Sequence, residues 1–305
     1  MEDSLPCRHG HSQALLEAMM SEVTCPLCDS PTHDKLFTED SIRIVSCHCG
    51  MMYSTPQASQ GDLEAHYDEN YEGNSVAIYA RTREAAFRHY VNRLQRFGAS
   101  GRHLDVGSSF GFLMDTMGKA GFDTEGVEIS KPAIRHAREV LGRKVTEGVF
   151  TSARFPDNTF DAITMTDIVE HLARPRVELR EAWRVLRPGG LLLVAVPNMP
   201  FQRFKMKVAD VWETLLGRRP SWGTVIPRIH INHFTRHSLR RMLEDERFEV
   251  LMIEPGPVNR QKPRGSWHVL MDLTKRSLYA VTRWVHSLSG RCIGQELLAV
   301  ARKPR

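Results

Sequence analysis

From about residue 80 onward, short apolar segments alternate with amphipathic segments of helical length, and this alternation restricts the fold more than any other feature. The first five apolar segments, which we predict to be strands, are residues 102–107, 123–130, 144–150, 160–167 and 191–198. Apolar residues recur at helical spacing before and between them. Strands that alternate with helices form a mostly parallel sheet covered on both faces, an α/β fold. Ligands of such sheets bind beyond the carboxyl ends of the strands.

The last third of the chain completes the predicted sheet. Residues 248–256 and 296–303 are two further strands, which brings the number to seven, and we expect one of them to run antiparallel. Pro-Gly-Gly at 188–190 is a predicted turn before the fifth strand. A helical insertion at about 199–229 either covers a pocket or packs in the core. A basic amphipathic helix at 267–288 either docks on the sheet or lies on an anionic membrane, so peripheral membrane contact stays open.

Small residues gather where the first strand passes into the first helix. The sequence HLDVGSSFGFLMD, residues 103–115, brings together Asp105, Gly107, Ser108, Ser109 and Gly111. Several small residues in one such turn indicate that the backbone must come close to a ligand, although tight packing of the glycines is an alternative. The turn lacks the complete G-x-G-x-x-G pattern of pyrophosphate binding.

A carboxylate strengthens the ligand interpretation of this turn. Glu128 ends the second predicted strand, 23 residues after Asp105. At that edge of the sheet, a carboxylate can accept hydrogen bonds from both hydroxyls of a ribose. The turn and Glu128 together therefore predict a nucleotide-like ligand.

Four of the six cysteines form two close pairs, CPLC at 25–28 and CHC at 47–49. Four sulfur ligands on two turns are typical of a closed, structural, tetrahedral zinc site, which can fold a segment too short to fold alone. Ser46 stands where a second C-x-x-C pair would begin, so Cys47 or His48 has to supply a ligand. Reduced cysteines without a metal are the alternative. The predicted ligands are Cys25, Cys28, Cys47 and Cys49.

Composition and charge leave a globular protein with three segments. These are a polar, mobile tail at 1–22, a zinc-ribbon-like module at 23–55 and an α/β domain at 65–305. Hydrophobic residues make up 41% and charged residues 25% of the chain, and no stretch approaches the roughly 18 apolar residues of a membrane span. The beginning of the sequence has no basic region followed by an apolar one, so we expect no signal peptide and a cytoplasmic location.

Five segments together resemble the small-molecule branch of the class I S-adenosylmethionine-dependent methyltransferases. They are LDVGSSFGFL (104–113), GVEIS (126–130), FPDNTFDAITMTDIVEHLARP (155–175), LRPGGLLLVAVPN (186–198) and HINHFTRHSLRRML (230–243). The resemblance covers residues 65–305 and implies a Rossmann-like, seven-stranded, mostly parallel sheet. It also implies S-adenosylmethionine as cofactor.

The resemblance assigns roles to individual positions. It places Asp105, Gly107, Ser108 and Gly111 at the methionine end of the cofactor, and Glu128 and Ile129 at the ribose. Val149 and Phe150 would flank the adenine, and Asp167 and His171 would face the reacting end. Ser109 replaces the usual second glycine, and Val149 stands where many relatives carry an acidic residue for the adenine amine.

Methyl transfer to a hydroxyl needs a group that accepts a proton near neutral pH, and histidine is suited to this. His171 is the first candidate, with packing against the following helix as the alternative. His230 and His233 are further candidates, and as a His-x-x-His pair they could instead bind a metal, although two ligands without acidic neighbours make a weak site.

The predicted acceptor is a hydroxyl of a small or lipid-linked molecule. Residues 23–49 contain four acidic residues against Lys35 and Arg43, which is not the basic surface that nucleic acid requires, and no N-P-P-Y motif is present. An RNA methyltransferase that grips RNA with the zinc module is the first alternative. A protein that binds the cofactor without turnover is the second.

Overall fold

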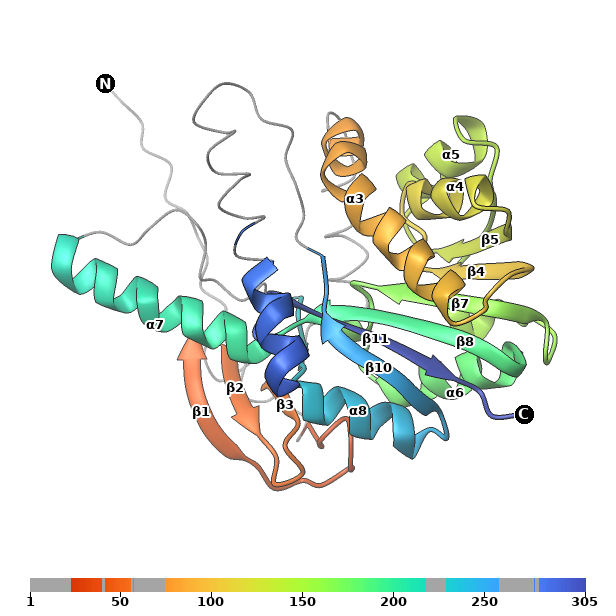
Figure 1. Ribbon diagram of the computed structural model, residues 1–305. Coiled ribbons are helices and arrows are strands. Elements are labelled where there is room, and N and C mark those ends of the chain that lie inside the picture. Colours follow the sequence, from red (N-terminus) through yellow and green to blue (C-terminus); the bar gives the residue numbers. More distant parts are fainter. Residues whose placement is uncertain are drawn as a thin grey trace, which may run out of the picture.

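The computed structural model describes residues 23–39, 42–55, 57, 75–217, 229–257, 277 and 280–305 (Figure 1). The strands are β1 (Asp34–Glu39), β2 (Ile42–Ser46), β3 (Met52–Thr55), β4 (Arg102–Val106), β5 (Asp123–Glu128), β6 (Lys144–Glu147), β7 (Phe160–Thr166), β8 (Leu186–Pro197), β9 (Asn232–His233), β10 (Glu249–Pro255) and β11 (Glu296–Arg302). The helices are α3 (Ser75–Arg96), α4 (Phe112–Lys119), α5 (Lys131–Glu139), α6 (Pro175–Val185), α7 (Met199–Leu216) and α8 (Arg236–Asp245), with short 3₁₀ turns η1 (Phe150–Ser152) and η2 (Val169–His171).

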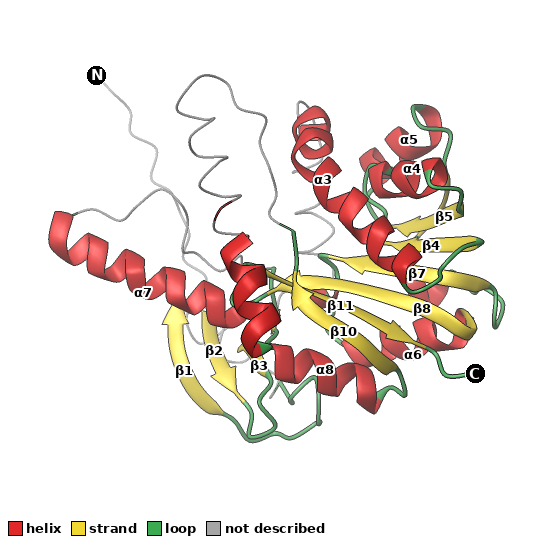
Figure 2. Ribbon diagram, in the orientation of Figure 1, coloured by secondary structure: helices red, strands yellow, loops and turns green. Residues whose placement is uncertain are grey.

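Seven strands form the large sheet in the order β10-β11-β8-β7-β4-β5-β6 (Figure 2). β11 is antiparallel to both of its neighbours, and every other neighbouring pair is parallel. The predicted Rossmann-like, seven-stranded, mostly parallel sheet is therefore confirmed. Because β4 lies between β5 and β7, the chain changes its direction of winding at β4, and loops from both halves meet beyond its carboxyl end.

Both faces of the sheet are covered, and β8 shows how the sequence achieves this. Successive side chains of a strand point to opposite faces. Leu192, Val194 and Val196 belong to a core that includes residues of α6 and α8, whereas Leu191, Leu193 and Ala195 pack with residues of α3 and α4. All six side chains are buried, which explains why this strand reads as a continuous apolar run.

A second sheet has the strand order β1-β2-β3-β9, and all of its neighbouring pairs are antiparallel. The first three strands come from the cysteine-rich segment, but β9 comes from the region that follows α7. Cys25, Leu27 and Tyr53 pack in the same apolar core as Leu192 and Phe234. The cysteine-rich segment is therefore joined to the rest of the chain through a common apolar core and through its pairing with β9.

Several local expectations differ from the structure. Residues 188–190 are not a turn before the fifth strand but part of β8, where the register against β7 shifts between Phe160 and Ala162. The glycines are accommodated as an irregularity inside the strand, with Gly189 at a φ of 82°. The third strand ends at Glu147, because the chain then turns into η1.

The described part of the predicted insertion forms a helix, α7, and several of its apolar side chains are exposed. Phe204, Val211 and Leu215 are 62%, 58% and 75% exposed, so these residues do not pack in the core of the described structure. Of the predicted helix at 267–288, the described part includes residues 280–288, and Trp284 there is 63% exposed. The predicted tail at 1–22, and residues 267–276 of the predicted helix, lie outside the described residues. No helix in the described part of the chain is long and apolar enough to cross a membrane.

Candidate functional site

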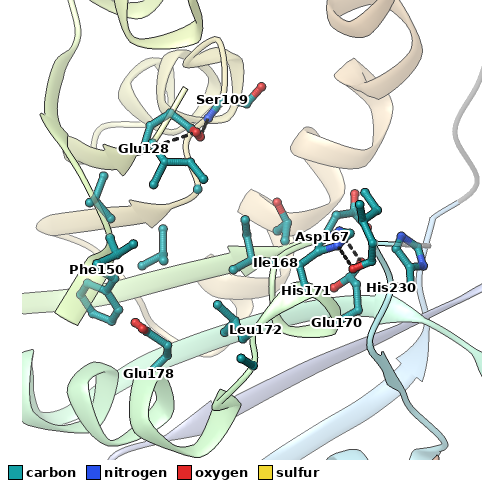
Figure 3. Close-up of a pocket in the computed structure, with 18 of the residues that line it drawn as sticks. Ser109, Glu128, Phe150, Asp167, Ile168, Glu170, His171, Leu172, Glu178 and His230 are labelled. Carbon is teal, nitrogen blue, oxygen red and sulfur yellow. Dashed lines mark hydrogen bonds and ion pairs between the residues drawn. The ribbon is translucent and has the colours of Figure 1, made fainter. Parts of the chain in front are cut away.

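A cavity of about 890 Å³ opens at the carboxyl ends of β4, β5, β7 and β8 (Figure 3). This is the edge where a parallel sheet binds its ligands. The predicted residues that line it are Gly107, Glu128, Ile129, Val149, Phe150, Asp167, His171 and His230. Among the described residues, the cavity lining does not include Asp105, Ser108, Gly111 or His233.

Glu128 stands at one end of the cavity and is held by the backbone. Its carboxylate accepts hydrogen bonds from the N–H groups of Ser109 at 2.8 Å, Ile129 at 2.8 Å and Ser130 at 2.9 Å. The residue is only 6% exposed. The first of these bonds crosses from the turn after β4 to the end of β5, and Ser109 adopts a φ of 49° to make it. The carboxylate is thus preorganised before any ligand arrives.

Two glycines in the lining are required for different reasons. Gly107 has a φ of 71°, and a Cβ there would lie 2.1 Å from Cδ1 of Ile168, so any side chain would displace the far wall of the cavity. Gly148 has a φ of 126°, and a Cβ there would meet no atom within 4 Å. Gly148 therefore presents bare backbone to open space, which suits close approach of a ligand.

The other small residues of the turn serve packing. A Cβ on Gly111 would lie 3.0 Å from Cβ of Ala137, so this glycine allows α4 to approach α5. The side chain of Ser108 lies over Gly126 of β5, where an added Cβ would come within 2.7 Å of it. The structure thus supports both interpretations of the turn, since Gly107 borders the cavity and Gly111 packs between helices.

Asp105 points away from the cavity into a buried chain of hydrogen bonds. Its carboxylate accepts from the hydroxyl of Thr164 at 2.6 Å, and that hydroxyl lies 2.9 Å from Nε2 of His103. Burial raises the pKa of Asp105 to about 7, and the nearby charge of Glu128 acts in the same direction. Burial also lowers the pKa of His103 to about 3. Asp105 therefore couples β4 to β7 behind the turn.

Acidic residues gather at the opposite end of the cavity. Asp167, with a φ of 53°, forms an ion pair with Arg83 of α3. Glu170 is 1% exposed, and neither of its carboxylate oxygens has a hydrogen-bond partner in the described part of the chain. Burial, and then the charge of Asp167, raise the pKa of Glu170 well above its ordinary value. Glu296 accepts a hydrogen bond from the hydroxyl of Tyr90 at 3.0 Å, and burial raises its pKa to about 8.

His171 lies among these carboxyl groups with a defined orientation. Its Nδ1 is 2.9 Å from the carbonyl oxygen of Ile229, so Nδ1 is the donor and the neutral ring carries its lone pair at Nε2. Nε2 is 3.9 Å from Oε1 of Glu170, and the ring of His230 lies edge-on with a centroid distance of 4.7 Å. Glu170, His171 and His230 each have one atom that could serve as a metal ligand, and these three atoms lie within 4.8 Å of one another.

His233 does not join this group. It is 5% exposed, and its Nε2 lies 2.8 Å from the hydroxyl of Ser54 in the small sheet. Burial lowers its pKa to about 4, which keeps the ring neutral.

Sequence reasoning did not single out Arg83, Glu170 and Glu296, which all line the cavity. Glu170 lies beside His171 in the VEHLARP motif, and this position could have identified it as a candidate site residue. Arg83 and Glu296 come from α3 and β11, far apart in the sequence, and no local pattern connects them to the site.

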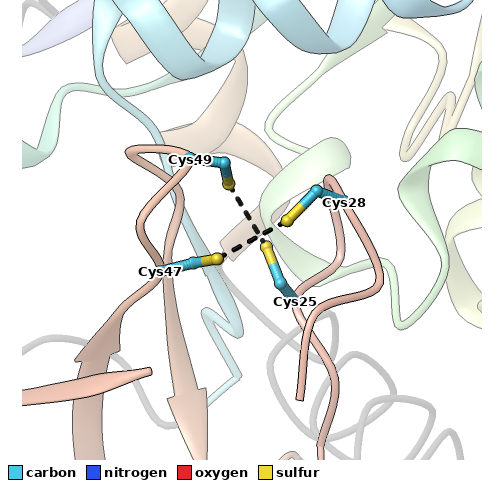
Figure 4. A group of neighbouring side chains, drawn as sticks. All are labelled: Cys25, Cys28, Cys47 and Cys49. Atoms are coloured by element: carbon cyan, nitrogen blue, oxygen red, sulfur yellow. Dashed lines mark hydrogen bonds between the residues drawn. The ribbon is translucent and has the colours of Figure 1, made fainter. Parts of the chain in front are cut away.

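The four predicted metal ligands converge on one point (Figure 4). Their Sγ atoms all lie within 4.8 Å of one another, and the Cys25–Cys49 and Cys28–Cys47 pairs are each 3.5 Å apart. Sulfurs about 2.3 Å from a tetrahedral zinc ion are about 3.8 Å apart, so the geometry suits that ion. Cys47 supplies the second ligand pair with Cys49, and the imperfect C-x-x-C spacing does not prevent convergence.

Comparison with known proteins gives a consistent result. The profile of a family described as "Methyltransferase domain" matches residues 79–253. A ubiquinone biosynthesis O-methyltransferase of Alkalilimnicola ehrlichii is 31% identical over 110 residues, which are 33% of this chain and 44% of that protein. The chain thus spans less than half the length of this curated relative.

Solved structures show the same fold. Burkholderia thailandensis 1,6-didemethyltoxoflavin-N1-methyltransferase, with bound 1,6-didemethyltoxoflavin and S-adenosylhomocysteine, superposes with a TM-score of 0.54 at 13% identity over 89% of this chain and 100% of that chain. The cyclase SpnF superposes with a TM-score of 0.53 at 18% identity, over 81% of this chain and 97% of that chain. At these identities the likeness concerns the fold alone.

Proposed function

Because this chain belongs to the family of class I S-adenosylmethionine-dependent methyltransferases, we propose that it methylates a hydroxyl group of a small-molecule or lipid-linked acceptor. One observation supports the proposal above others. A single cavity of about 890 Å³ carries a backbone-held carboxylate, Glu128, at one end and an oriented histidine, His171, at the other. Cavities of this size hold ligands the size of a nucleoside cofactor and a small acceptor.

The end at Glu128 fits the nucleoside of the cofactor. A carboxylate fixed by three N–H groups keeps about one of its four acceptor positions for a ribose hydroxyl, and the bare backbone of Gly107 and Gly148 lies beside it. Val149 and Phe150 extend this end with apolar surface for an adenine ring. When bound, S-adenosylmethionine supplies a methyl group made reactive by its sulfonium. The chain's own contribution at this end is binding and alignment.

The end at His171 fits a hydroxyl acceptor. Its Nδ1 donates to Ile229, so Nε2 can accept the proton that an attacking hydroxyl loses. Glu170 lies 3.9 Å from Nε2, and burial raises its pKa, which favours the neutral carboxyl group beside the ring. Asp167, paired with Arg83, lines the cavity at the same end as His171.

The four cysteines fit a structural zinc ion. The donor set is complete without water, which is the arrangement of structural sites, and the cysteines lie outside the lining of the cavity. Elemental analysis of protein purified without chelator should find close to one zinc per chain. Less than about half an equivalent would contradict the assignment.

Transfer of labelled methyl from S-adenosylmethionine into fractionated cell extract tests the function. We expect label in small molecules or lipids. Label confined to RNA or protein would contradict the proposed acceptor. Binding of S-adenosylhomocysteine without any transfer would contradict turnover.

A further inference from the structure

We infer that the small sheet holds the acceptor end of the cavity in place, and that Asn232 and Ser54 are the positioning residues that connect the cysteine module to His171. This inference deepens the proposed function and rests on it for the role of His171. It starts from the segment 229–234, which lies between the small sheet and the 3₁₀ turn η2 that carries Glu170 and His171.

The segment is bound to η2 on one side. The carbonyl of Ile229 accepts from Nδ1 of His171 at 2.9 Å, and the N–H of Ile231 donates to the carbonyl of Glu170 at 2.9 Å. Asn232 is 2% exposed, and its Nδ2 donates to the carbonyls of Val169 at 3.1 Å and Leu172 at 2.7 Å. The side-chain amide of Asn232 thus contacts the backbone at both ends of η2.

The same segment is bound to β3 on the other side. Met52 and Tyr53 pair with His233 and Asn232, and the N–H of Ser54 donates to the carbonyl of Ile231 at 2.9 Å. The hydroxyl of Ser54, 1% exposed, donates to the carbonyl of His230 at 3.0 Å and accepts from Nε2 of His233 at 2.8 Å. Two residues of the acceptor wall, Ile229 and His230, are therefore continuous with a strand that pairs with the cysteine module.

A separate connection joins the first cysteine turn to the other flank of η2. Nη1 of Arg176, at the beginning of α6, donates to the carbonyl of Leu27 at 3.0 Å, between Cys25 and Cys28. Nε of Arg176 pairs with Glu246 at 2.6 Å, which fixes the guanidinium. Residues 172–174, between η2 and α6, line the cavity. The cysteine-rich segment is therefore connected to both flanks of η2, through the segment 229–234 on one side and through Arg176 on the other.

The described hydrogen bonds of the ribose end do not involve the small sheet. Glu128 accepts from the N–H groups of Ser109, Ile129 and Ser130, which all lie in the β4–β5 half of the large sheet. Loosening the small sheet should accordingly disturb the acceptor end and leave cofactor binding intact. This separation distinguishes positioning from general support of the fold.

The experiment uses the full chain labelled with ¹³C-histidine, observed by NMR with S-adenosylhomocysteine bound. His171 is assigned with His171→Gln, and His136, which contacts Phe110 at the other side of the sheet, serves as an internal reference. Asn232→Leu removes both bonds to η2, and Ser54→Ala removes the side-chain bond to His230. Thr235→Ala is the matched control, because Thr235 directly follows this segment and caps α8, and its side chain bonds to Ser238 rather than to η2.

We expect Asn232→Leu and Ser54→Ala to shift the signal of His171 but not that of His136, with the dissociation constant of S-adenosylhomocysteine changed by less than about threefold. Thr235→Ala should shift neither signal. Ser54→Thr keeps the hydroxyl and should leave the signal of His171 at its wild-type position. An unmoved His171 signal in both variants, or an equal shift in Thr235→Ala, would overturn the inference. If Asn232→Leu does not fold, the comparison of Ser54→Ala with Ser54→Thr tests the inference on its own. Because no readout here depends on an acceptor, failure of the proposed methyl transfer remains a separate result.

Discussion

Replacement of Glu128 by glutamine tests the assignment of the ribose end most directly. In the structure, Oε1 accepts from Ile129 and Ser130, and Oε2 accepts from Ser109. Glutamine keeps one acceptor oxygen and replaces the other with an NH₂ group, which cannot accept a hydrogen bond. The new NH₂ group therefore faces a backbone N–H donor. The negative charge that would strengthen hydrogen bonds from a ribose hydroxyl is also lost.

The magnitude follows from the charged hydrogen bond that is removed. Such bonds contribute about 1.5–3 kcal/mol, which corresponds to a dissociation constant about 10- to 150-fold weaker for S-adenosylhomocysteine. Titration calorimetry of the wild type and Glu128→Gln measures this change, and circular dichroism checks that the variant is folded. The assay needs no knowledge of the acceptor.

The neighbouring strand provides a matched control. Glu147 is the register partner of Glu128 at the end of β6, is exposed, and does not line the cavity within the described residues. Glu147→Gln makes the same chemical change one strand away and should leave the dissociation constant within about twofold. Equal affinities of Glu128→Gln and wild type would refute the role of Glu128 at the ribose.

Three further predictions concern other parts of the chain. His171→Gln should lower methyl transfer about 100-fold with S-adenosylhomocysteine binding retained, whereas His136→Gln, which alters a histidine bonded to the carbonyl of Phe110, should stay near the wild-type rate. Gly107→Ala should lower the free energy of unfolding, measured by urea denaturation, by about 1–3 kcal/mol more than Gly121→Ala does. Both glycines have a positive φ, but only a Cβ added at Gly107 would contact Ile168. His103 has a folded pKa of about 3, below the unfolded value, so the unfolded chain takes up its proton first as the pH falls below about 6.5. Between pH 7.5 and 5.5, His103→Gln should therefore lose about 1.4 kcal/mol less stability than the wild type, and parallel pH profiles of the two would contradict the burial argument.

The sheet could be predicted because its strands are apolar on both faces and its helices on one. That pattern identifies the seven strands before any contact is known. The prediction was wrong at 188–190, where Pro and Gly usually indicate a turn, because an irregularity in strand pairing accommodates the same residues inside β8. β9 was missed because two residues are too few for a periodic signal.

The two carboxylates that sequence reasoning placed at the cofactor show where the site could not be predicted. Glu128 and Asp105 both lie at the ends of parallel strands, and both carry the residue type that binds a ribose. Their exposures are alike, 6% and 2%, but Glu128 borders the cavity and Asp105 bonds to Thr164 inside the sheet. The difference depends on which side of the strand each residue faces at the turn, and the pattern of residue types does not contain that information.

The spacing of His230 and His233 illustrates a more general point about the acceptor end. On a helix, residues three apart share a face, but in an extended segment they point to opposite sides. The segment is extended here, because it pairs with β3, so His230 lines the cavity while His233 bonds to Ser54. The two histidines of an apparent motif thus occupy separate places, one in the wall of the cavity and one in the small sheet. The same alternation sends the Asn232 side chain to η2, so a short strand that pairs with β3 also contacts the turn that carries Glu170 and His171.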